Sequence, residues 1–145
     1  MTLESSLWST TSAALSPFGK LVRLENSIGK GEGDVVYCLR RPKPGSLAAT
    51  GFLELKVAER QVRDSTPIRP HHLTLDQVLF TEGWASAGGR AFLLLRMPPW
   101  YLLFDPPGIR GLYDGAVSRG RAELVAVVAE HGRFPLGPIL RALTK

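Results

Sequence analysis

Two carboxylates and a lysine occur at spacings that suit phosphodiester hydrolysis. Glu54 and Lys56 are two residues apart in the stretch GFLELKV, so on an extended chain both side chains project from one face beside Phe52. Asp34 opens the stretch DVVYCLRR, directly after the glycine-rich run SIGKGEG. If these stretches pair as antiparallel strands, Asp34 comes close to Glu54 and Lys56. Carboxylate oxygens are the ligands that Mg²⁺ prefers, and a neighbouring lysine can orient a water molecule or accept its proton.

The E-x-K triplet also has an ordinary explanation, because such triplets are common on the solvent-facing side of a half-exposed strand. Two observations favour a site instead. An antiparallel pairing brings Asp34 to the same face, and the adjacent glycines leave room for a ligand. Mg²⁺ normally binds through one or two carboxylates together with a substrate phosphate, and we expect Mn²⁺ to substitute for it.

The strands that would hold these residues follow from local patterns. We expect a helix in SSLWSTTSAALSPF, which ends at Pro17 and Gly19, then a short strand in KLVRLEN. DVVYCLRR and GFLELKV are the next two strands and form a hairpin. Thr74 and Gln77 give the T-x-x-Q pattern of a capping box at the start of another helix.

The remaining elements complete a mixed α/β pattern. RAFLLLRM and WYLLFD are apolar enough to be buried strands. A helix is expected from about Arg121 to Glu130, and a short one around Gly137 to Leu143. We also expect Trp84 in the core. The sequence therefore predicts an α/β domain with a mixed β-sheet flanked by helices.

Length and composition favour one domain over residues 1–145, with a core over about 4–105 and a C-terminal helical extension over 106–145. The single cysteine, Cys38, excludes a disulfide framework or a cysteine-rich zinc site, and we expect it to be buried in its strand. The first residues lack a signal-peptide pattern, and the longest apolar stretch is too short to span a bilayer. We expect a cytoplasmic chain with no membrane partner.

The charge distribution favours a polyanionic partner. The formal net charge is +5, and 13 of the 18 basic residues are arginine. The excess lies in residues 40–72, with seven basic against three acidic residues, and in residues 106–145, with six against three. A small, arginine-rich basic domain is biased toward nucleic acid, although a merely basic surface explains the same numbers.

The ordered stretches RLENS, GEGDVVYCL, GFLELKV, LTLDQ and GGRAFLLLR resemble the PD-(D/E)XK nuclease superfamily over about residues 4–97. They look most like its small phage-encoded branch, related to VRR-NUC domains and archaeal-type Holliday-junction resolvases. The resemblance implies a restriction-endonuclease-like fold and a Mg²⁺-dependent DNA endonuclease. Asp34, Glu54 and Lys56 match the family's metal-binding and water-activating positions, whereas Gly33 stands where a proline is common.

The resemblance also implies a further glutamate before the second strand, and the sequence offers two. Glu25, at the end of the first strand beside the glycine loop, is favoured over Glu4 on the opening helix. Related nucleases often place a polar residue on the helix after the E-x-K strand, facing the metal, and Gln77 fits that role. Its place in the capping box explains Gln77 equally well, so both interpretations stay open.

The implied partner is DNA. The residues expected to contact it are Ser27, Lys30, Arg40, Arg41, Lys43, Arg60, Arg63 and Arg69. Resolvases of this kind make two symmetric cuts, which implies a homodimer, and a phage-encoded chain would act in the host cytoplasm. The alternative from another functional class is a catalytically inactive DNA-binding or assembly protein on the same fold.

Overall fold

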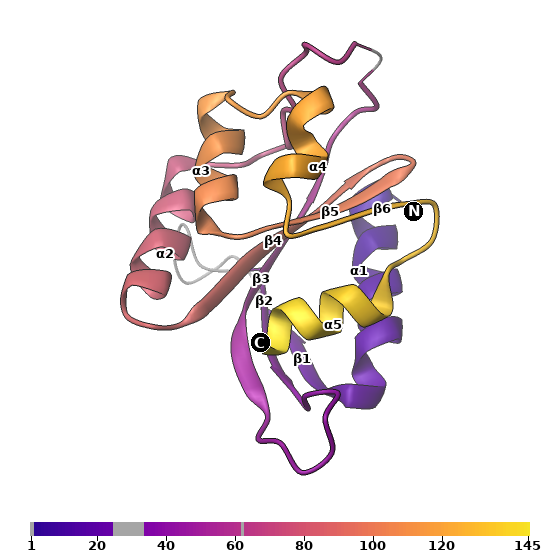
Figure 1. The fold of residues 1–145 in the computed structure, drawn as a ribbon, viewed down its shortest axis with the longest axis vertical. Coiled ribbons are helices and arrows are strands. Elements are labelled where there is room, and N and C mark those ends of the chain that lie inside the picture. The colour runs from indigo at the N-terminus through magenta and orange to yellow at the C-terminus, as the bar shows by residue number, and fades with distance from the viewer. Residues whose placement is uncertain (1, 25–33, 62) are drawn as a thin grey trace.

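A six-stranded mixed sheet runs through the part of the chain that the structure, a computed structural model, describes: residues 2–24, 34–61 and 63–145 (Figure 1). The strands lie side by side in chain order: β1 (Gly19–Arg23), β2 (Val35–Leu39), β3 (Ala49–Val57), β4 (Arg90–Met97), β5 (Trp100–Phe104) and β6 (Val128–His131). Neighbouring strands are antiparallel except β3 and β4, which are parallel because the helix α2 (Leu75–Ser86) lies on the connection between them.

Helices cover both faces of the sheet (Figure 1). On one face lie α1 (Leu3–Leu15) and α5 (Leu136–Thr144), which pack against buried residues of β3 such as Leu53 and Leu55. On the other lie α2, α3 (Pro106–Asp114) and α4 (Ala122–Val125), around a core that includes Leu93 and Leu95 of β4. Two short 3-10 helices, Ser16–Phe18 and Arg119–Arg121, precede β1 and α4. This confirms the expected α/β class with a mixed sheet flanked by helices.

The alternation of β3 decides which face carries the chemistry. Leu53 and Leu55 face α1 and α5, so Glu54 and Lys56 face the side that α2 covers. The hairpin of β2 and β3 forms as expected, with Val35 opposite Leu53.

The helix expected from about Arg121 to Glu130 is wrong. Only Ala122–Val125 is helical, and the chain then turns extended at Ala126 and continues as β6, which pairs with β5. The valine-rich run suits a strand, and pairing satisfies its backbone groups while Val128 is buried. Helix α3 was not expected, although Asp105 caps its start and Gly115, in a left-handed conformation at φ 73°, ends it.

Two expectations about single side chains are also wrong. Trp84 lies near the C-terminal end of α2 and is 39% exposed. Its ring packs edge-on against Phe52, with centroids 4.6 Å apart, and stacks on Phe80. Cys38 is exposed, since its neighbours Tyr37 and Leu39 take the buried face of β2.

Helix α5 is fastened to the sheet by a buried hydrogen bond. The Tyr37 hydroxyl donates to the Leu143 carbonyl at 2.7 Å. A Cβ on Gly51 of β3 would lie 2.5 Å from that hydroxyl, so glycine is needed there for close approach. Among the described residues, no helix is both long and apolar enough to cross a membrane.

Candidate functional site

The start of β2 and the middle of β3 meet at Asp34 and Glu54. The Asp34 backbone N–H donates a 3.1 Å hydrogen bond to Oε2 of Glu54. In return, the Leu55 backbone N–H donates to the Asp34 carboxylate. The antiparallel pairing therefore brings Asp34 and Glu54 together, as the sequence predicted.

Glu54 and Lys56 are buried rather than solvent-facing, at 4% and 6% exposure. The Lys56 ammonium lies 3.6 Å from Oε1 of Glu54 and donates a 3.0 Å hydrogen bond to the backbone carbonyl of His72. The explanation of E-x-K as a half-exposed charged strand face does not hold. A buried ion pair pays a large desolvation cost, which makes it weak as a purely stabilising device.

Burial perturbs both carboxyl groups. It raises the pKa of Glu54 to about 7, with the nearby Asp34 also raising it, while the Lys56 ammonium and the hydrogen bonds lower it. Burial likewise raises the pKa of Asp34, against the lowering influence of Arg23, the Leu55 N–H and Lys56. Perturbed carboxyl groups beside a buried lysine are typical of functional sites.

Gln77, in the first turn of α2, is engaged at both ends of its side chain. Its Oε1 accepts from the Thr74 N–H at 3.1 Å and the Thr74 hydroxyl accepts from the Gln77 N–H, which completes the predicted capping box. Its amide nitrogen donates a 2.9 Å hydrogen bond to Oε1 of Glu54. Gln77 therefore caps the helix and contacts the buried carboxylate at the same time.

The two candidates for a third carboxylate differ in what the structure says of them. Glu25 lies outside the described residues, as do Ser27 and Lys30. Glu4 is half-buried in the first turn of α1, and its charge raises the pKa of Asp34, so it lies within electrostatic range of the site. Within residues 2–24, 34–61 and 63–145, no three His, Cys, Asp or Glu side chains converge closely enough to hold a metal ion together.

A divalent cation fits the donors that the described residues do provide. Asp34 and Glu54 offer carboxylate oxygens, the preferred ligands of Mg²⁺. Their raised pKa values reflect the cost of burying negative charge, which a cation at that point would offset.

The predicted DNA contacts separate into two groups. Arg60, Arg63 and Arg69 are exposed and follow β3 at the end nearest Lys56. Arg40, Arg41 and Lys43 lie in the connection between β2 and β3, and the register puts that connection at the other end of the hairpin from Asp34. Arg40 donates to the Pro17 carbonyl, and Arg41 to the carbonyls of Thr144 and Leu47.

His72 is the contact that sequence reasoning missed. It contributes only its backbone carbonyl to Lys56, and its φ of 60° lies in the left-handed region. The side-chain types in a sequence do not indicate which backbone carbonyl will accept a hydrogen bond. The only signal in the sequence was a loop histidine two residues before the Thr74 cap.

Comparison with known proteins adds one structural likeness. No protein-family model and no curated protein matches the chain. Among solved structures, it is similar to Hjc, a Holliday junction resolvase from the archaeal hyperthermophile Archaeoglobus fulgidus, with 16% sequence identity, a TM-score of 0.48, and coverage of 74% of this chain and 75% of that chain. The site is therefore interpreted from its own geometry and chemistry.

Proposed function

We propose that this chain is a Mg²⁺-dependent DNA endonuclease, with structure-selective, Holliday-junction-resolvase-like cleavage as its finer activity. The observation that carries the proposal is the buried cluster of Glu54, Lys56 and Asp34, because burying these charges is costly unless they bind something. The finer assignment to a phage-type, VRR-NUC-like branch is supported by the sequence resemblance.

Each residue of the cluster has a distinct role in this proposal. Asp34 and Glu54 would hold Mg²⁺, with Glu4 or Glu25 as the additional carboxylate. When bound, the cation supplies charge stabilisation at the scissile phosphate and acidifies water. Lys56 orients the attacking water and stabilises charge that develops on phosphate oxygens, while the His72 carbonyl holds its ammonium in place.

DNA reaches the cluster along the exposed arginines that follow β3. Arg60, Arg63 and Arg69 lie on the connection that leads from Val57 to α2, next to Lys56 in the chain. Cationic side chains at this place neutralise backbone phosphates without reading sequence. A junction cut at two symmetric positions requires two such sites, so we propose a homodimer.

The test compares wild type with Asp34→Asn and Glu54→Gln, and with Glu123→Gln as a control at an exposed carboxylate of α4. Both site variants remove an anionic ligand and should lose Mg²⁺- or Mn²⁺-supported cleavage by orders of magnitude while still binding DNA. The control should cleave normally. Full cleavage by Glu54→Gln would end the proposed site.

Substrate structure is tested on four-way junctions, flaps, nicked and linear duplexes at one ionic strength. Faster cleavage of the junction supports the resolvase-like activity. Equal rates on junction and linear duplex would remove that finer activity and leave the nuclease. Salt-dependent DNA binding with no cleavage by wild type under any divalent cation would favour the inactive DNA-binding protein instead.

A further inference from the structure

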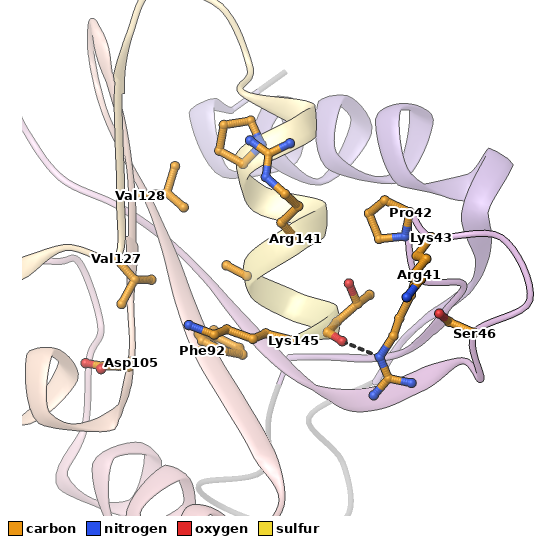
Figure 2. A pocket seen from close by; sticks show the side chains of 13 residues that line it. Arg41, Pro42, Lys43, Ser46, Phe92, Asp105, Val127, Val128, Arg141 and Lys145 are labelled. Atoms are coloured by element: carbon orange, nitrogen blue, oxygen red, sulfur yellow. Dashed lines mark hydrogen bonds between the residues drawn. The ribbon is translucent and has the colours of Figure 1, made fainter.

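A groove of about 1030 Å³ lies on the α5 side of the sheet, away from the Glu54 cluster (Figure 2). Its floor includes Phe92, which packs against the same core cluster as α5. Figure 2 shows Arg141 and Lys145 projecting from the end of the chain, with residues of the β2–β3 connection on one side and Val127 and Val128 on the other. The groove shares no lining residue with the proposed catalytic cluster.

The rim of the groove carries four positively charged side chains: Arg41, Lys43, Arg141 and Lys145. Among the described residues that line the groove, only Asp105 is acidic, and its carboxylate already accepts the Gly108 N–H as the cap of α3. In the part of the chain that the structure describes, none of the four is in an ion pair with a carboxylate. The groove is thus where the basic 40–72 segment and the basic C-terminal segment meet.

One of these cations is fixed in place rather than neutralised. The Arg41 guanidinium donates to the Thr144 carbonyl at 2.7 Å and to the Leu47 carbonyl at 2.5 Å. Carbonyl oxygens orient the guanidinium and leave its net charge intact. Two arginines outside the groove differ in this respect, because Arg110 pairs with Glu82 and Arg119 pairs with Asp64.

The floor of the groove is apolar. It is lined by Phe92, Val127, Val128, Ala142 and two prolines, and Val127 is 45% exposed. A cationic rim over an apolar, partly aromatic floor suits a single strand, which presents phosphates to the rim and unstacked bases to the floor. A duplex presents phosphates outward and keeps its bases stacked inside. An inorganic anion would leave the apolar floor uncovered.

We infer that this groove binds a single-stranded segment of DNA, at a site separate from the catalytic cluster. The inference rests on the proposed function in one respect, that DNA is the polymer this chain handles. It also gives Arg41 and Lys43 a place of contact at the end of the hairpin remote from Asp34.

The experiment measures binding of a fluorescently labelled 12-nucleotide oligothymidylate by anisotropy at several salt concentrations. The variant Arg141→Glu/Lys145→Glu reverses two rim charges. The control Arg121→Glu/Arg133→Glu makes the same change in net charge at two exposed arginines that do not line the groove. We expect the groove variant to lose at least about tenfold in affinity relative to the control. The magnitude of its salt slope should fall by roughly 1.4, at about 0.7 per phosphate contact.

A second comparison tests the apolar floor on wild-type protein. An abasic strand of the same length and charge should bind about fivefold or more weaker than oligothymidylate, since stacking contributes roughly 1–3 kcal/mol per base. Equal affinity of the groove variant and the control, or equal affinity for the abasic strand, would overturn the inference. The inference would also be overturned if the groove variant lost binding to a poly-glutamate peptide while its binding to oligothymidylate was unchanged. That result would identify an acidic-peptide site.

The same proteins separate this inference from the proposed function. Cleavage of a short duplex that reaches only the catalytic cluster should be unaffected by the groove substitutions. Glu54→Gln should retain single-strand binding. If Glu54→Gln cleaves normally, the proposed nuclease site fails, whereas the anisotropy result for the groove stands on its own.

Discussion

The Gln77 side-chain amide on α2 donates a 2.9 Å hydrogen bond to Oε1 of Glu54 on β3. The other end of the same amide accepts from the Thr74 N–H. One side chain therefore caps the start of a helix and contacts a buried carboxylate. The capping interpretation is confirmed, and a role of Gln77 beside a metal stays a prediction.

Two substitutions separate these two roles of Gln77. Thr74→Ala removes the hydroxyl that accepts the Gln77 N–H and leaves the contact with Glu54. Gln77→Met removes the side-chain oxygen that accepts the Thr74 N–H together with the contact with Glu54, and it keeps the side-chain length. Each should cost about 0.5–2 kcal/mol of stability through the weakened cap. Only Gln77→Met should also lower kcat/KM for Mg²⁺-dependent cleavage, by about tenfold or more, because Glu54 loses a hydrogen bond that orients it. Equal kcat/KM for the two variants would show that Gln77 acts only as a cap.

The raised pKa of Glu54 predicts a pH dependence of stability in metal-free protein. The folded-state pKa of about 7 lies above the ordinary 4.5, so this carboxyl's contribution to stability is complete below about pH 4.5 and is lost as pH rises through 7. The difference corresponds to roughly 3 kcal/mol. Chemical denaturation in EDTA at pH 5 and pH 8 measures it.

Glu54→Gln is the matched variant for that measurement. It removes the titrating group and should abolish most of the loss of stability between pH 5 and 8. At pH 8 it should be as stable as wild type or more so, even after losing about 1 kcal/mol with one of the two hydrogen bonds that Glu54 accepts. An unchanged pH dependence in Glu54→Gln would mean that another group is responsible.

The fold could be predicted from the sequence where local patterns decide it. The capping box at Thr74 and the hairpin of β2 and β3 depend on residues that are close in sequence, and both form as expected. Strand β6 could not be predicted in this way. Its valines gain from being extended only because β5 is beside them, and that pairing joins Leu103 to Val128 across the intervening helices.

The candidate site likewise has features that local sequence patterns predict and features that they do not. The approach of Asp34 to Glu54 followed from strand pairing, and that pairing also implied that residues 40–43 lie at the far end of the hairpin. Contacts that depend on backbone conformation were not predictable. The His72 carbonyl that accepts from Lys56 belongs to a residue with φ of 60°, which side-chain chemistry does not reveal.

The hydrogen bond from Tyr37 to Leu143 is expected to stabilise the packing of α5 against the sheet. Tyr37→Phe leaves the buried Leu143 carbonyl without its 2.7 Å donor, which should cost about 1–3 kcal/mol of stability. Hydrogen exchange should quicken mainly in α5. Tyr113→Phe, at a tyrosine that is 37% exposed, is the control and should change stability by no more than about 0.5 kcal/mol. Equal stability of the two variants would contradict the role given to Tyr37.

Lys56 and His72 together test how the ammonium is positioned. Lys56→Met keeps an unbranched side chain but removes the charge that orients water and stabilises charge on phosphate. Metal binding should survive, while kcat falls by about a hundredfold or more. His72→Asn keeps the backbone carbonyl that holds the Lys56 ammonium, and asparagine tolerates positive φ. It should therefore retain kcat within about threefold and show an unchanged pH profile. A large loss of kcat in His72→Asn, with a shifted pH profile, would instead give the imidazole a direct part in the chemistry, and normal turnover by Lys56→Met would remove the lysine from it.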